Sequence, residues 1–196
     1  LSAAGCSGQN PSYNERLDTT LEAIKNAEEE LQAEADKFNS ERLESGGVEI
    51  QTAAISDHLD TVEEQLNAAE SSANQDQRDD IQAIKNWIVL LREFTEFLDI
   101  FAEGFSQASS GFAYIQSEQF PDAVNELNTA KETLSSASEQ LIITQDAWDD
   151  IDRSRLENTE DISVAEIENY FSQVENIMSV FIPLTSGMGT LSEGLI

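Results

Sequence analysis

The spacing of apolar residues constrains the fold of this chain more than any other feature. From Ser12 onward, along nearly all of the 196 residues, apolar side chains recur three and four residues apart. Proline occurs only at positions 11, 121 and 183, and the alternating polar and apolar pattern of a half-buried strand is absent. The sequence therefore predicts an all-α protein, an antiparallel helical bundle of about five helices.

The first three helices can be placed from their apolar seams. A helix from about Ser12 and a second one that ends before Asn74 are joined by a glycine-containing turn at 45–47, and should form an antiparallel hairpin. The first seam is broken by Glu28. The third helix should begin after the segment 74–76 and continue to about Ser117. It carries the broadest apolar face, which predicts that it is the central helix.

Two more helices are predicted downstream. The fourth, starting at Pro121, alternates small and large residues along one seam, a pattern that favours close helix packing. The fifth follows a loop and should kink or restart at Pro183. Beyond that proline, helical spacing continues through Leu184, Met188, Leu191 and Leu195. This apolar tail predicts either docking on the bundle or on a partner, or a further segment after Ile196.

The charge of the chain limits its ligands and suggests its environment. Asp and Glu total 39 against 10 Lys and Arg, a formal net charge of −29. This surplus repels phosphate backbones and predicts that the protein does not bind nucleic acid. The few lysines and the many carboxylates resemble proteins of halophilic archaea, in which molar salt shortens the screening length to about 3 Å. An ordinary acidic bacterial protein is the alternative.

The first residues contain the one cysteine of the chain. They read Leu-Ser-Ala-Ala-Gly-Cys-Ser-Gly, small residues before a lone Cys6. This stretch resembles the cleavage box of a lipoprotein signal, with Ala3 where the box prefers Leu. The resemblance implies that Cys6 bears a lipid and that the protein lies on the extracytoplasmic face of the membrane. An ordinary cysteine in a disordered N-terminus is the alternative.

The domain boundaries follow from these patterns. We expect 1–11 to be a signal-peptide remnant and tether, and 12–196 to be a single helical domain, in which the hairpin 12–74 could be a separable unit. The longest strictly apolar run, 87–91, is far shorter than the roughly 20 residues of a membrane span. The lipid is therefore the only membrane attachment that we predict.

A helical hairpin over residues 104–137 resembles a tetratricopeptide unit. Small residues stand where its two helices would cross, and Pro121 suits a first helical position because an N–H there has no acceptor within the helix. The resemblance places the crossing at Gly111, Tyr114, Ala123, Leu127 and Ala130. We expect Gly111 and Ala123 to face each other. A helical hairpin with small residues at its crossing, outside that family, is the alternative, because no second unit follows at a 34-residue period.

Catalytic sites are limited by the residue counts. The single histidine, His58, and the single cysteine support no nucleophilic triad, and C-x-x-C pairs, Glu-x-x-His pairs and phosphate-binding glycine loops are absent. We therefore predict that the protein is not an enzyme and needs no cofactor. His58 should be a partly exposed residue on the flank of the second helix.

One acidic loop suggests a cation site. Oxygen-bearing side chains occupy positions 1, 3, 5, 9 and 12 of a twelve-residue segment, which resembles the ligand spacing of an EF-hand: Asp150, Asp152, Ser154, Asn158 and Asp161. The resemblance implies a Ca²⁺ site. Arg155 stands where that loop expects glycine, and a solvated acidic loop is the alternative.

These features favour a lipid-anchored, extracytoplasmic, salt-adapted scaffold that binds a protein or cell-surface component through an apolar groove. The alternative is a small-ligand-binding helical domain of a sensor or solute-uptake system. An enclosed pocket beside Trp87 or Trp148 would favour the ligand-binding domain, whereas an open groove or an exposed apolar patch would favour the scaffold.

Overall fold

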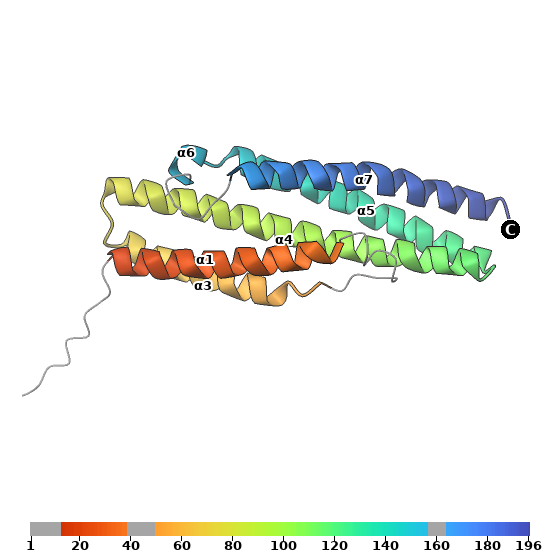
Figure 1. The fold of residues 1–196 in the computed structure, drawn as a ribbon, viewed down its shortest axis with the longest axis horizontal. Helices are drawn as coiled ribbons and strands as arrows, with labels where there is room; N and C mark the ends of the chain where they lie inside the picture. The colour runs from red at the N-terminus through yellow and green to blue at the C-terminus, as the bar shows by residue number, and fades with distance from the viewer. Residues whose placement is uncertain (1–12, 39–49, 157–163) are drawn as a thin grey trace, which may run out of the picture.

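The computed structural model describes residues 13–38, 50–156 and 164–196. Within these ranges the chain forms helices and no strand, and the predicted all-α bundle is confirmed (Figure 1). The elements in chain order are α1 (Tyr13–Ala35), the 3-10 turn η1 (Asp36–Phe38), α3 (Ala53–Glu70), α4 (Gln75–Gln116), α5 (Phe120–Asp149), α6 (Arg153–Leu156) and α7 (Val164–Glu193).

Helix α4 is the central element, as predicted, and its boundaries agree with the sequence. The side chain of Asn74 accepts a hydrogen bond from the Gln77 backbone N–H at 3.0 Å, and the Gln77 side chain accepts one from the Asn74 N–H at 2.9 Å. This reciprocal capping box satisfies two N–H groups that have no partner within the helix. From it α4 runs for 42 residues, or about 63 Å at 1.5 Å per residue.

The two ends of the molecule contain different numbers of helices (Figure 1). Helices α1 and α3 cover only the first part of α4, as far as Asp99, whose carboxylate accepts a hydrogen bond from Thr52 Oγ1 at 2.8 Å. We call this part, with the facing C-terminal third of α5, the start of α7 and the one-turn helix α6, the five-helix end, after its five long helices. Among the described residues, the remainder of α4 (100–116) packs with the first part of α5 and the second half of α7, and forms the three-helix end.

Large aromatic side chains fill the five-helix end. The rings of Trp87 on α4 and Trp148 on α5 meet edge to face at 6.2 Å, and both side chains are buried. Phe171 of α7 lies 6.3 Å from the Trp148 ring and from Phe94 of α4. The buried Trp87 needs an acceptor for its N–H, and Glu28 of α1 provides one at 2.7 Å. This contact explains why a carboxylate interrupts the apolar seam of the first helix.

Helix α7 continues through Pro183 to Glu193 and does not restart there. A proline inside a helix removes the N–H that would bond to the carbonyl four residues earlier, here Ser179. Both Ser179 and Pro183 are exposed, so water can satisfy that carbonyl. The proline therefore lies on the solvent side of α7, where it costs the least.

Candidate interaction surface

The second half of α7 buries polar residues and exposes apolar ones. Thr185 and Ser192 are 0% and 1% exposed, whereas Val180, Leu184 and Leu191 are 65%, 46% and 64% exposed. An amphipathic helix on the surface of a monomer normally has the opposite arrangement. The reversal indicates that the outer side of α7 is suited to contact rather than to water.

The packing of α7 on α5 accounts for the buried polar side. Thr185 Oγ1 donates to the Phe181 carbonyl at 2.9 Å, and Ser192 Oγ donates to the Met188 carbonyl at 2.9 Å, so neither hydroxyl is buried without a partner. A Cβ placed on Gly189 would lie 3.7 Å from Leu127 Cβ of α5. Gly189 thus lies at ordinary contact distance from α5, and Phe181 and Ile182 pack partly against the core. Val180, Leu184 and Leu191 are left outside.

The exposed apolar side chains form one stripe along the helix. At about 100° per residue, the four that belong to α7 fall within about 60° of arc on the helix surface. Leu195 follows in the turn after Glu193, and all five side chains are 40% to 65% exposed. We call this stripe the α7 outer face: Ile177, Val180, Leu184, Leu191 and Leu195. Gly187 lies in its middle, and a Cβ placed there would meet no atom within 4 Å. Gly187 therefore lies on an open surface between Leu184 and Leu191.

The α7 outer face is free of charge. No Asp, Glu, Lys or Arg occurs between Glu175 and Glu193, and both of these glutamates fall on the opposite side of the helix, about 180° from the stripe. On α4, the neighbouring segment between Glu103 and Glu118 also lacks charged residues. In a chain with 39 acidic residues, two uncharged segments side by side form a distinct surface.

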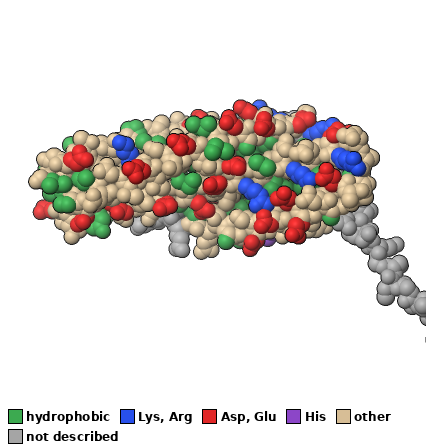
Figure 2. All heavy atoms as spheres, turned by 180° about the vertical axis from the view of Figure 1, so that it is seen from behind, with side chains coloured by type: hydrophobic (Ala, Val, Ile, Leu, Met, Phe, Trp, Pro, Cys, Tyr) green, Lys and Arg blue, Asp and Glu red, His purple; other side chains and the backbone are tan. Residues whose placement is uncertain are grey.

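The basic residues lie mainly at the other end. Figure 2 shows most Lys and Arg side chains over the five-helix end, on the face that it displays. Ion pairs among the described residues follow the same division: Lys85 with Glu70, and Arg92 with Asp60 and Glu63, all join α3 to α4. The two ends thus differ in charge pairing as well as in thickness.

A partial signal for this surface is present in the sequence. The continued spacing of Leu184, Leu191 and Leu195 predicts that the tail docks on the bundle or on a partner. In the structure these three side chains are exposed, and Met188 is half-buried. The sequence does not reveal that the stripe begins at Ile177. This residue lies between Val174 and Met178, which belong to the buried seam, so the two apolar patterns cannot be separated there.

The predicted helix crossing is a place of close approach between α4 and α5. A Cβ placed on Gly111 would lie 2.6 Å from Leu127 Cγ, closer than real Cβ contacts. All three nearest atoms belong to Leu127. The closest partner of Gly111 is therefore Leu127, whereas the sequence analysis expects Ala123. A second close contact, which the sequence analysis missed, lies two turns away, where a Cβ on Gly104 would be 2.9 Å from Leu134 Cγ.

The other residues of the predicted crossing differ in exposure. Ala123 and Ala130 are completely buried, which agrees with tight packing on α4. Tyr114 is 36% exposed, and its carbonyl accepts the backbone N–H of Gln119 at 2.9 Å in the turn between the helices. Glu118 in the same turn has a φ of 60°, a left-handed conformation uncommon outside glycine. The likeness to a tetratricopeptide unit stays a prediction.

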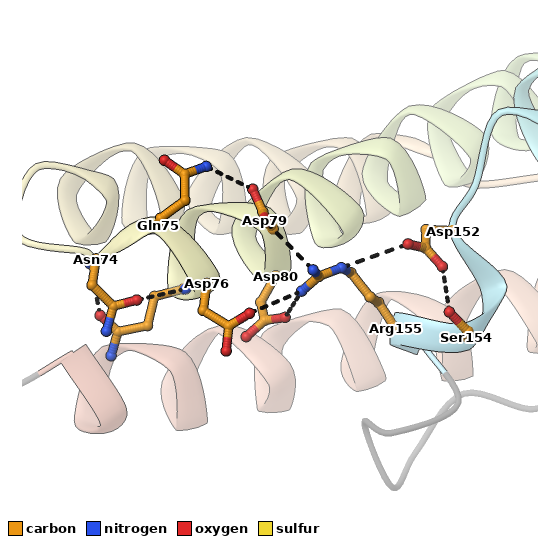
Figure 3. A network of polar contacts seen from close by, with 9 residues as sticks. Asn74, Gln75, Asp76, Asp79, Asp80, Asp152, Ser154 and Arg155 are labelled. Atoms are coloured by element: carbon orange, nitrogen blue, oxygen red, sulfur yellow. Dashed lines mark hydrogen bonds and ion pairs between the residues drawn. The ribbon is translucent and has the colours of Figure 1, made fainter.

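The acidic loop after α5 is organised around an arginine (Figure 3). From α6, Arg155 reaches the start of α4, where its guanidinium lies 2.8 Å from Asp80, 3.4 Å from Asp79 and 3.8 Å from Asp76. Its Nε is 3.5 Å from Asp152. The hydrogen bond to Asp80 raises the pKa of Arg155. One cation thus ties the segment after α5 to the beginning of α4.

Three of the five predicted calcium ligands lie among the described residues. Asp150 is exposed, and Asp152 Oδ1 accepts a hydrogen bond from Ser154 Oγ at 2.6 Å, which lowers the pKa of Asp152. Asn158 and Asp161 lie outside the described residues. Within the described ranges, no group of three or more His, Cys, Asp or Glu side chains is arranged to hold a metal ion. The calcium site stays a prediction.

His58, Cys6 and the two tryptophans are the other residues that the sequence singles out. His58 lies on α3 with its side chain 41% exposed and its Nε2 3.4 Å from Glu30 of α1, which confirms a partly exposed flank position. Cys6 lies outside the described residues. Trp87 and Trp148 are 3% and 5% exposed and contact each other, and the guanidinium of Arg153 lies 4.6 Å from the Trp148 ring.

Comparison with known proteins gives no relative. No family model matches the chain, and neither the curated proteins nor the solved structures include a significant match. Among the helices that the structure describes, none is both long and apolar enough to cross a lipid bilayer. The exposed surface of the bundle is therefore the basis of the proposed function.

Proposed function

We propose that this protein is a lipid-anchored, extracytoplasmic, salt-adapted scaffold that binds another protein through the α7 outer face. The observation that carries the proposal is the reversed burial of α7, in which Thr185 and Ser192 point inward and Val180, Leu184 and Leu191 point outward. Exposed apolar stripes of this length on monomeric proteins mark interaction sites. The contact between Trp87 and Trp148 favours the scaffold over a small-ligand-binding domain, because each ring occupies space beside the other where a ligand would otherwise lie.

The shape of the bundle suits such a scaffold. Helix α1 begins at Tyr13 at the outer tip of the five-helix end, and α7 ends at the opposite tip (Figure 1). A lipid on Cys6 would hold the five-helix end near the membrane. The α7 outer face would then be presented away from the membrane, at the far end of the roughly 63 Å that α4 spans.

Crosslinking in native membranes tests the binding role. A photoreactive residue such as benzoyl-phenylalanine would replace Leu184 on the α7 outer face or, as a matched control, Ile142, which is 55% exposed on α5. Irradiation in molar KCl should give protein adducts from position 184 and far fewer from position 142. Equal yields from the two positions, or lipid adducts alone at position 184, would contradict a protein-binding face.

The anchor is tested separately. Replacing Cys6 by Ser should release the protein from the membrane into the medium and remove the lipid mass from the mature N-terminus. Intact-mass analysis of the native protein decides the matter. If that analysis finds Leu1 to Gly5 present and unmodified, the anchor proposal is wrong, whatever the α7 outer face binds.

A further inference from the structure

We propose that the protein bound by the α7 outer face is a second copy of this chain, paired antiparallel along α7 about a twofold axis. This inference rests on the proposed protein-binding role of that face and names its partner. Three features of the described residues carry it: the symmetry of the stripe, the glycine at its centre and the absence of charge around it.

The spacing of the stripe reads the same in both directions. Val180 and Leu184 are four residues apart, Leu191 and Leu195 are also four apart, and seven residues separate the two pairs. In a twofold interface, residue i of one copy meets residue j of the other, and j meets i. An antiparallel pair centred between 187 and 188 would therefore place Leu184 against Leu191, and Val180 against Leu195, on both sides of the axis.

The centre of the stripe permits close approach. Gly187 lies next to the axis of such a pair, and a Cβ placed there would meet no atom of its own chain within 4 Å. Small residues at a crossing allow two helices to come close, while the larger residues on either side interlock. In the pair, the Leu and Val side chains on both sides of Gly187 would fill the space between the two helices.

Charge selects this face for contact between copies. Two chains of net charge −29 repel each other over most of their surfaces. The repulsion is weakest where both partners present no carboxylate, and Glu175 and Glu193 lie on the far side of α7. A partner that recognised the acidic surface would need basic residues and would gain nothing from an uncharged stripe. A second copy supplies a matching uncharged surface.

The size of the contact sets its strength. From Ile177 to Leu195 the stripe is about 27 Å long and one helix diameter, about 10 Å, wide. A stable interface buries roughly 800 Å² on each partner, so the uncharged segment of α4 between Glu103 and Glu118 must contribute to the contact. We therefore expect a reversible dimer. The two Tyr13 ends lie at opposite ends of this pair, so two lipid-anchored copies that present the α7 outer face away from their membranes would pair across facing membranes.

Sedimentation equilibrium of the full chain in molar KCl tests the pairing. The parent should show a concentration-dependent shift from 21.6 kDa to twice that mass. Leu184→Asp places one carboxylate from each copy in the seam, and should raise the dissociation constant at least about 100-fold, the effect of about 1.4 kcal/mol from each copy. Ile142→Asp, an equally exposed site on α5, should leave the dissociation constant unchanged. Circular dichroism verifies that both variants fold.

Cysteine crosslinking tests the orientation in a Cys6→Ser background. A mixture of Leu184→Cys chains and Leu191→Cys chains should form a disulfide between the two variants, and Leu184→Cys alone should form far less, because disulfides require Cα atoms within about 7 Å. Efficient linkage of Leu184→Cys to itself would indicate parallel helices and overturn the inference. A parent that stays monomeric would also overturn it. If the monomer nevertheless gives protein adducts from position 184 in membranes, the proposed function stands and only the identity of the partner is wrong.

Discussion

The five-helix end and the three-helix end are built from different side chains, although α4, α5 and α7 run through both. At the five-helix end, Trp87, Trp148 and Phe171 fill the core, and arginines and lysines join α3 and α6 to α4. At the three-helix end, Ala123 and Ala130 line the contact of α5 with α4 beside glycines, and the rings of Phe105 and Phe181 lie 4.9 Å apart between α4 and α7. Other apolar side chains of α7 at that end point outward. The difference teaches that one end is built for stability and the other for contact.

Salt should change the stability of the protein more than any single substitution. A charge surplus of 29 needs screening, and the screening length falls from about 10 Å at 0.1 M to about 3 Å at 1 M. We expect a gain comparable to the whole stability of a typical domain, about 5 to 15 kcal/mol. Circular dichroism across a KCl titration measures this gain in stability.

The two ends should also differ in how they respond to the removal of salt. Hydrogen exchange during dilution should show the three-helix end opening first, and earlier opening of α1 and α3 would reverse our comparison.

The small-residue core is tested by Gly111→Leu. A new side chain would overlap Leu127, whose Cγ lies 2.6 Å from the position of a Cβ, so the helices would have to move apart. Overpacking typically costs about 1 to 3 kcal/mol, and we expect the upper part of that range. Thermal unfolding in molar KCl compares it with Ser136→Leu, an exposed control on α5. If both variants melt alike, close packing at the three-helix end is not required.

Much of the three-helix end could be predicted, because its signals are local. Gly111 and the alternating small and large residues of α5 predict the close crossing, and Asn74 marks the start of α4. The Gly104–Leu134 contact escaped prediction because it depends on the register of the two helices. The orientation of α7 also escaped, since its sequence contains two overlapping apolar stripes. Which stripe turns inward depends on how α7 packs on α4 and α5, and only the packed bundle reveals that orientation.

Glu28 tests the five-helix end in the same way. Glu28→Ala would leave the buried Trp87 N–H without the acceptor that now lies at 2.7 Å, which typically costs about 1 to 3 kcal/mol. Glu28→Gln retains an acceptor oxygen and should cost less than half as much. Glu29→Ala removes an exposed carboxylate nearby and is the control. Chemical unfolding in molar KCl ranks the three variants. A loss for Glu29→Ala as large as for Glu28→Ala would argue for a charge effect and against the hydrogen bond.

The smallest effect concerns the loop that Arg155 ties to α4. Ser154→Ala removes the hydrogen bond that lowers the pKa of Asp152, so this pKa should move back toward its ordinary value. A lowered carboxylate pKa stabilises the fold above the unfolded-state pKa, and the contribution is lost as the pH falls through the folded-state value. The variant should therefore lose part of the pH dependence of stability that comes from Asp152 in the acidic range, because Arg155 still lowers this pKa. Carboxyl NMR titration measures the shift, and an unchanged pKa would show that Ser154 has no part in it.

Calcium binding is tested on the same loop. Asp150→Ala should abolish any heat of Ca²⁺ binding in isothermal titration, because Asp150 occupies the first position of the predicted ligand set. Equal heats for this variant and the parent would remove the calcium prediction. Arg155 already lies beside four carboxylates of this region, so the result also shows whether a second cation can be accommodated there.

The most direct test of a contact surface on α7 is hydroxyl-radical footprinting of the full chain at low and high protein concentration in molar KCl. We predict that labelling of Leu184 and Leu191 falls as the concentration rises, because the α7 outer face becomes covered by a second copy. Ile142 and Val89, which are 55% and 48% exposed on α5 and α4, should be labelled equally at both concentrations. Constant labelling of Leu184 and Leu191 would contradict pairing through this face.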